Sequence, residues 1–146
     1  MIVVEAPYRS ELWGAFLQVR REVLRWPLGL EYTDADLASE TGDVCLIATE
    51  AHSSPFPLGG LLLRPHGPEL KMRQVAVRAD LQGRGVGRSL VEASEDYART
   101  HNYQRIVLHA RTSAVPFYLA VGYETEGDEF EEVGIPHLFM FKNLTR

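Results

Sequence analysis

Apolar residues recur along this chain with two periods, and each period predicts a different kind of element. Apolar positions at steps of three and four from Leu12 to Trp26 predict an amphipathic helix, which Ser10 caps and Pro27 ends. Further helices are predicted at residues 34–38, 86–100 and 114–121. Thr33 or Asp34 caps the first of these, and Gly122 ends the last in a left-handed conformation.

Short apolar runs bounded by turn residues predict the strands. These strands are residues 2–6, 44–51, 58–63, 69–77, 104–111, 123–126 and 136–144. A crossover helix separates 69–77 from 104–111, so these two strands should pair in parallel, whereas hairpin-length loops join the middle strands. The pattern predicts an α+β fold in which helices flank one mixed, mostly antiparallel sheet. No repeat or linker interrupts it, so we expect one domain over residues 1–146.

Composition narrows the class of protein. Hydrophobic residues make up 45% and charged residues 24%, which is typical of a globular domain. The net charge of −5 argues against a nucleic-acid partner and mildly favours a cationic or amine substrate. Cys45 is the single cysteine, which excludes an internal disulfide and a cysteine-rich zinc site, and we predict no metal. No stretch approaches the roughly 20 apolar residues of a membrane span, so we expect a cytoplasmic protein without a membrane partner.

The strongest chemical signal is residues 82–89, Gln-Gly-Arg-Gly-Val-Gly-Arg-Ser, between a predicted strand and a predicted helix. Glycines let a ligand approach the backbone closely, and the first turn of a helix offers unpaired N–H donors at its positive end. Arg78, Arg84 and Arg88 lie in or near this loop. This loop is therefore suited to bind a phosphate or pyrophosphate.

Three phosphate loops must be distinguished. A Walker A loop fails, because Gln82 stands at its first glycine and Arg88 at its lysine, and a GxGxxG dinucleotide fingerprint fails because this is GxGxG placed mid-chain. The coenzyme A loop, Gln/Arg-x-x-Gly-x-Gly/Ala, matches residues 82–87 at every defined position. In this motif the chain resembles the GCN5-related N-acetyltransferase (GNAT) superfamily. The plainer alternative is a glycine-rich turn that begins an ordinary helix.

The resemblance extends over residues 69–140. Residues 114–123, Ala-Val-Pro-Phe-Tyr-Leu-Ala-Val-Gly-Tyr, are similar to the second signature of that superfamily, although Arg111 stands where many members have asparagine. Residues 130–137, Phe-Glu-Glu-Val-Gly-Ile-Pro-His, resemble the C-terminal region of a small, poorly characterised subset.

The resemblance implies a binding site for acetyl-CoA between the strand that ends at Val77 and the strand that begins at Gln104. The backbones of Val75 and Val77 would bind the pantetheine arm, and the Val75 N–H would donate to the acetyl carbonyl. The implied pyrophosphate-binding positions are Gln82, Gly83, Arg84, Gly85, Val86, Gly87, Arg88 and Ser89.

Two candidate catalytic residues follow. Tyr118 matches the tyrosine whose phenol, in many members, donates a proton to the departing thiolate; alternatively it is an aromatic residue at a helix start. His137 is our first candidate for the base that accepts the amine proton, since imidazole titrates near neutral pH, and its alternative is a structural histidine bonded within the sheet. Other candidates for the base are Glu22, Glu31, Glu131, Glu132 and His109, and the loop residues Glu31 and Tyr32 are candidates for substrate contact.

The main hypothesis is an acetyl-CoA-dependent N-acetyltransferase in which a small-molecule or peptide amine attacks directly in a ternary complex. No activated nucleophile is apparent, because Cys45 lies in an apolar strand. Competing hypotheses are an acyl-CoA-binding sensor or interaction module, and an ATP-binding protein, which lacks a recognisable Mg²⁺ partner near the glycines. The chain could be a monomer or a homodimer, since Phe139 and Phe141 could serve an interface or the core.

Overall fold

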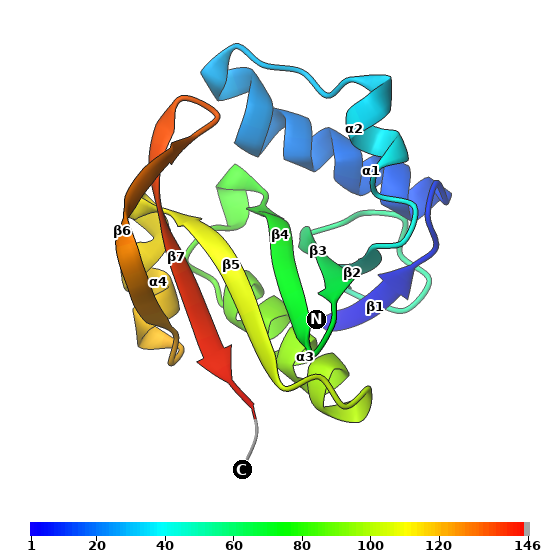
Figure 1. Ribbon diagram of the computed structural model, residues 1–146. Coiled ribbons are helices and arrows are strands. Elements are labelled where there is room, and N and C mark those ends of the chain that lie inside the picture. The colour runs from blue at the N-terminus through cyan, green and yellow to red at the C-terminus, as the bar shows by residue number, and fades with distance from the viewer. Residues whose placement is uncertain (145–146) are drawn as a thin grey trace.

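The computed structural model describes residues 1–144, in which seven strands form one sheet with helices on both faces (Figure 1). The strands are β1 (Ile2–Ala6), β2 (Val44–Thr49), β3 (Gly59–His66), β4 (Glu69–Val77), β5 (Arg105–Arg111), β6 (Glu124–Glu132) and β7 (Ile135–Asn143). The α-helices are α1 (Glu11–Arg20), α2 (Asp34–Ala38), α3 (Val86–Thr100) and α4 (Val115–Ala120). Shorter helical turns are η1 (Arg21–Arg25), η2 (Trp26–Leu28), η3 (Ala79–Leu81) and η4 (Thr112–Ala114).

The sheet order is β1-β2-β3-β4-β5-β7-β6, and its strand pairs are antiparallel except β4 with β5 within the described residues. The parallel pair is the one that the crossover helix predicts. This arrangement confirms the α+β class with a mixed, mostly antiparallel sheet.

Alternate residues of each strand face opposite sides of the sheet and form two cores. On β2, Leu46 and Ala48 belong to the core under α3, whereas Cys45 and Ile47 belong to the core under α1. In Figure 1, α3 and α4 lie behind the sheet. Cys45 is buried in the predicted apolar strand, and burial raises the pKa of its thiol to about 12, so the thiol is protonated at neutral pH.

The first helix differs from its prediction. It is α-helical only to Arg20 and then widens into the π-helical turn η1, in which the Trp26 N–H bonds to the Arg21 carbonyl. Arg111, at the end of β5, donates from Nη2 to the Leu24 carbonyl at 2.9 Å. This distant side chain provides a partner for a carbonyl of the widened turn, which apolar spacing within the helix could not indicate.

The predicted ends of three helices are confirmed. The side chain of Ser10 accepts from the Trp13 N–H at 3.3 Å, Thr33 forms a capping box with Asp36, and Gly122 has φ of 97°.

The strands predicted at 58–63 and 123–126 continue to residues 66 and 132. Residues 127–132 of β6 are mostly exposed and acidic, so pairing with β7 rather than an apolar pattern extends that strand.

In the middle of the sheet, β4 loses part of its pairing with both neighbouring strands. Gly60 of β3 faces Ala76 and Leu62 faces Arg73, so a β-bulge leaves Gln74 and Val75 without register partners on β3 in the described chain. Gln74 has φ of 55°, in the left-handed region. β5 pairs with β4 only over Glu69–Met72, and beyond that point the two strands diverge, as Figure 1 shows.

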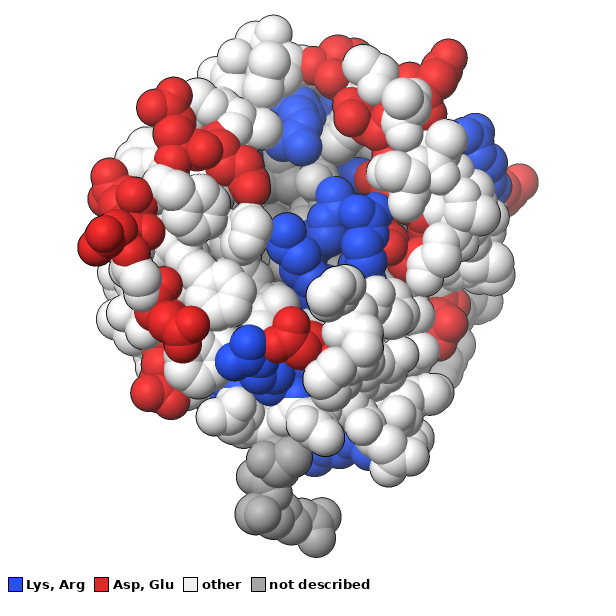
Figure 2. Space-filling view, in the orientation of Figure 1, with Lys and Arg blue, Asp and Glu red and all other residues white. Residues whose placement is uncertain are grey.

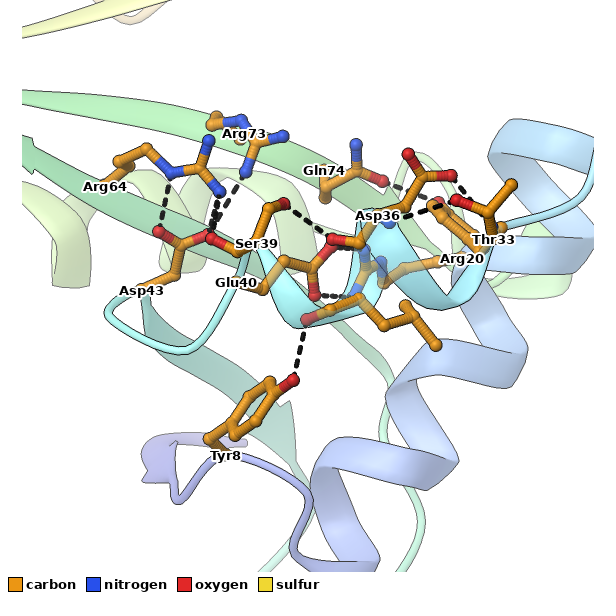
Figure 3. Close-up of polar contacts among 12 residues, drawn as sticks. Tyr8, Arg20, Thr33, Asp36, Ser39, Glu40, Asp43, Arg64, Arg73 and Gln74 are labelled. Atoms are coloured by element: carbon orange, nitrogen blue, oxygen red, sulfur yellow. Dashed lines mark hydrogen bonds and ion pairs between the residues drawn. The ribbon is translucent and has the colours of Figure 1, made fainter.

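A buried ion pair ties α1 to the segment after α2 (Figure 3). Arg20 is fully buried and donates two hydrogen bonds to Glu40, of which Nη1 to Oε1 measures 3.0 Å. Nearby, Asp43 accepts from Arg64 Nε at 2.8 Å and from Arg73 Nη1 at 3.1 Å. These ion pairs hold the segment between α2 and β2 against β3 and β4.

We expect Glu40→Gln to lower the free energy of unfolding by about 3 kcal/mol or more, because it leaves the Arg20 charge buried without a counter-charge. Glu92→Gln, on the exposed side of α3, is the control and should change stability by less than about 0.5 kcal/mol. Urea denaturation of both variants measures the difference. Equal midpoints would show that the pair contributes little.

Candidate active site

A cavity of about 450 Å³ lies beside the end of β4, between the glycine loop and α4, and we call it the loop cleft. The predicted residues in its lining are Val75, Val77, Gln82, Gly83, Gly85, Val86, Gly87 and Arg88. Tyr118 also lines it, together with Val23, Leu81, Ala114 and Phe117. Of the predicted loop residues, Arg84 and Ser89 lie outside this lining.

The backbone of the loop turns through conformations that favour glycine. Gly83 and Gly85 have φ of 82° and 85°, and the Ser89 N–H donates to the Gly85 carbonyl at 3.0 Å, which begins α3. Gln82 donates from Nε2 to the Val77 carbonyl at 3.3 Å and ties the loop to the end of β4. At Gly87, a Cβ atom would lie 3.3 Å from the Phe117 ring, so the close approach of α4 also favours glycine there.

The start of α3 has the charge distribution of an anion site. No side chain of residues 1–144 caps this helix, and its first turn has no acidic residue. The exposed Arg84 and Arg88 instead lie at the positive end of the helix dipole, where cations are unfavourable unless an anion is present. The open N–H groups, the dipole and the two arginines are therefore all suited to bind a phosphate or pyrophosphate.

A second cavity of about 270 Å³ adjoins the loop cleft, and we call it the basic cavity. Val75, Ala114 and Tyr118 line both cavities, so they lie where the two meet. Tyr118 is only 6% exposed, and burial raises the pKa of its phenol. The hydroxyl therefore stays protonated at neutral pH and can act as a hydrogen-bond donor.

His137 lines the basic cavity and is only 3% exposed. Its Nδ1 is 2.9 Å from the Ile135 carbonyl, and because a carbonyl can only accept, Nδ1 carries the proton of the neutral ring. Nε2 is then free to accept a proton, and it lies 3.7 Å from Glu132 Oε2. The alternative prediction, a structural histidine bonded within the sheet, thus holds for Nδ1. Nε2 is still available to accept a proton.

Glu132 and His109 accompany His137 in the lining of the basic cavity, and His109 Nδ1 lies 2.9 Å from Glu132 Oε1. Burial would raise the pKa of Glu132, but the hydrogen bond from His109 and the nearby charges of His109, His137 and Lys71 outweigh it. The pKa of Glu132 therefore lies below its ordinary value. The structure thus brings together three of the candidate bases.

The other candidates lie elsewhere. Glu22, Glu31 and Glu131 do not line the basic cavity. Glu31 accepts hydrogen bonds from Arg21, Trp26 and its neighbour Tyr32, which shape the exposed loop. The Tyr32 hydroxyl donates to Gln74 Oε1 at 2.5 Å and supports the β4 bulge.

Cationic side chains in the basic cavity were missed by the sequence analysis. They are Arg25, Lys71, Arg73 and Arg111. Lys71 and Arg73 alternate along β4 and so share a face, and Arg111 is the departure from the superfamily pattern. The alternation of Lys71 and Arg73 and the unusual Arg111 are visible in the sequence. Only the folded chain brings Arg25 of η1 to the same cavity.

Comparison with known proteins identifies the family. Residues 41–144, more than half of the chain, match the family described as an acetyltransferase (GNAT) domain. The chain belongs to the GNAT acetyltransferase family. YyaT of Bacillus subtilis strain 168, an uncharacterised protein, is 30% identical to this chain over 90 residues, which are 62% of this chain and 61% of YyaT. The matched region thus spans less than two thirds of that relative.

Solved structures share the fold over nearly the whole chain. An acyl-CoA N-acyltransferase from Pseudomonas aeruginosa has a TM-score of 0.79 at 21% identity, covering 97% of this chain and 99% of that one. An aminoglycoside 6'-N-acetyltransferase complexed with coenzyme A has a TM-score of 0.79 at 15% identity, covering 100% and 98%. At these identities the likeness concerns the fold. Between residues 1 and 144, no helix is long and apolar enough to cross a membrane.

Proposed function

We propose that this GNAT acetyltransferase transfers the acetyl group of acetyl-CoA to an amine by direct attack in a ternary complex. The observation that carries the proposal is the start of α3, where an uncapped helix end and two arginines adjoin the opened edge of β4. A capping side chain or an acidic first turn would satisfy or complement the N–H groups of this helix end, and in the described part of the chain α3 has neither. The coenzyme A complex of the aminoglycoside acetyltransferase supports the same ligand for this chain.

The cofactor-binding roles follow from the lining of the loop cleft. The N–H groups of Gly83–Arg88, with the Arg84 and Arg88 side chains, bind the pyrophosphate. β5 does not pair with β4 at Val75 and Val77, so in our proposal their backbones bind the pantetheine arm as a neighbouring strand would. The Val75 N–H donates to the acetyl carbonyl and stabilises the developing oxyanion, an effect worth roughly 3 kcal/mol.

The amine must lose a proton during the reaction. Presenting a lysine-like amine of pKa ~10.4 in its neutral form at pH 7 costs about 4.6 kcal/mol, whereas an α-amine of pKa ~7.8 costs about 1 kcal/mol. In our proposal His137 accepts this proton at Nε2, directly or through water, and the nearby Glu132 carboxylate stabilises the imidazolium that forms.

Acetyl-CoA supplies a thioester, whose sulfur leaves as a thiolate of pKa near ~8.5. Tyr118 lines both cavities, and in our proposal its hydroxyl donates a hydrogen bond to that sulfur. Because burial raises the pKa of this phenol, the hydrogen bond rather than a completed proton transfer is its main contribution. The raised pKa of the buried Cys45 thiol argues against a covalent acetyl-enzyme and supports direct attack.

Calorimetry tests cofactor binding. We expect acetyl-CoA to bind at near-micromolar Kd, ATP not to bind, and Gly85→Glu to lose acetyl-CoA binding because it places an anion in the loop. Gly67→Glu is the control, since Gly67 also has a positive φ and open space around it but lies in the β3–β4 turn, outside the loop cleft. Absence of acetyl-CoA binding by the folded wild type would overturn the proposal. Tight binding without turnover of any amine would favour an acyl-CoA sensor.

We expect Tyr118→Phe to reduce kcat by one to two orders of magnitude without abolishing turnover, because the thiolate is already a tolerable leaving group. Thiol release from acetyl-CoA with the best amine of a panel gives kcat. Calorimetric binding of acetyl-CoA should remain unchanged, and it serves as the folding control. Complete loss of turnover with intact binding would assign the phenol an essential role.

We expect His137→Gln to reduce kcat at neutral pH by roughly 10²–10⁴-fold, with little change in the KM for acetyl-CoA. The loss should shrink as the pH rises toward the pKa of the acceptor amine, because the amine then deprotonates without help. A pH profile of kcat for both proteins measures this. A loss that is equal at every pH would instead indicate a structural role.

A further inference from the structure

The basic cavity has a charge opposite in sign to that of the whole protein. Its lining contains four cationic residues, Arg25, Lys71, Arg73 and Arg111, and one carboxylate, Glu132. Figure 2 shows Lys and Arg side chains gathered at a hollow in the middle of this face, with acidic side chains along β6 at the left edge. The net charge of −5 therefore does not describe this cavity, because the acidic residues of β6 are mostly exposed at the sheet edge.

The cations of the basic cavity are incompletely balanced by protein carboxylates. Arg73 shares the single carboxylate of Asp43 with Arg64. Within residues 1–144, no carboxylate oxygen lies within 4.0 Å of a side-chain nitrogen of Arg25, Lys71 or Arg111. Burial, and then repulsion from Arg25, lowers the pKa of Arg111, which fits a site where these two cations lie near each other.

Arg25 and Arg111 approach the cavity from two different elements and are held there by neutral groups. The Arg25 guanidinium lies over the Tyr32 ring, 4.7 Å from its centroid, and Arg111 Nη2 donates to the Leu24 carbonyl. Both side chains are half-buried and keep further N–H donors. A planar guanidinium presents its donors in the fork that matches a carboxylate.

We infer that the acceptor is a small amine that also carries a carboxylate, that is, an amino acid, and that Arg25 and Arg111 bind this carboxylate. This inference rests on the proposed acetyl transfer. Arg111 is the register partner of His137, so the carboxylate site adjoins the proposed base. The volume of about 270 Å³ is near the lower end of the usual range of ligand sites, which favours a small molecule over a peptide. The same cations would repel polyamines and other cationic amines.

The test compares matched acceptors. Glycine, β-alanine and γ-aminobutyrate are assayed with acetyl-CoA beside their carboxamides, and the aminoalkyl phosphonates of equal length distinguish carboxylate from phosphoryl recognition. We expect kcat/KM at least tenfold higher for one or more of the carboxylates than for its carboxamide. The carboxamide amines are less basic and so more often neutral, which biases the comparison against our inference.

Substitutions test whether Arg25 and Arg111 cause the preference for a carboxylate. Arg25→Gln should lower kcat/KM for the preferred carboxylate at least tenfold, mainly through KM, and should leave its carboxamide little changed. Arg111→Lys keeps a charge and a donor but loses the fork of the guanidinium. It should therefore lower kcat/KM for the carboxylate to a smaller extent. Arg21→Gln is the control, because Arg21 lies four residues away, pairs with Glu31 and does not line the basic cavity. It should keep the carboxylate preference.

A binding measurement separates this inference from the proposed function. Calorimetry of N-acetylglycine and N-acetylglycinamide, and of their longer homologues, with the CoA-saturated protein needs no turnover. Tighter binding of the carboxylates that Arg25→Gln removes would support the inference even if no amine were acetylated. Equal use of carboxylates and carboxamides in turnover, or equal binding of the acetylated pairs, would overturn it and leave the proposed transfer intact. A preference for phosphonates alone would also overturn it.

Discussion

The separation of β4 from β5 beyond Met72 is the constraint on which the rest of this structure depends. Backbone groups inside a sheet require hydrogen-bond partners, and an opened edge leaves them available to a ligand or to water. The bulge at Gln74–Val75 bends β4, while β7 pairs with His109–Arg111 and holds the end of β5 on the other side. The two cavities and Tyr118 all lie along the opening that results.

Contacts from the α1 side stabilise this opening. Tyr32 bonds to Gln74 in the bulge, and Arg111 bonds to the carbonyl of Leu24 in the widened turn after α1. The buried pair of Arg20 and Glu40 fastens the same layer to the segment before β2. A buried ion pair of this kind contributes less to net stability than to a defined arrangement, because desolvation offsets much of its attraction. In this protein that arrangement determines where Arg25 and Tyr32 lie.

Local charge, rather than net charge, describes the two candidate binding regions. Arg84 and Arg88 at the start of α3 and the cations of the basic cavity occur in a protein of net charge −5. Six of the 20 acidic residues lie on the mostly exposed strand β6. At the ionic strength of a cell, screening over about 8 Å weakens the influence of exposed charges on a site inside the sheet opening. An anionic ligand can therefore bind in an acidic protein.

The sequence by itself determined the order of elements, the caps at Ser10 and Thr33, the parallel pair and the glycine loop, because these depend on residues near one another in the chain. It also indicated the family through two short motifs in the matched region. Only the tertiary structure decided that η1 replaces the last turn of the helix, that Glu132 and His109 join His137, and that Arg25 meets Arg111. Those juxtapositions link segments far apart in sequence, and their geometry depends on a one-residue bulge and a long-range hydrogen bond, neither of which has a local pattern.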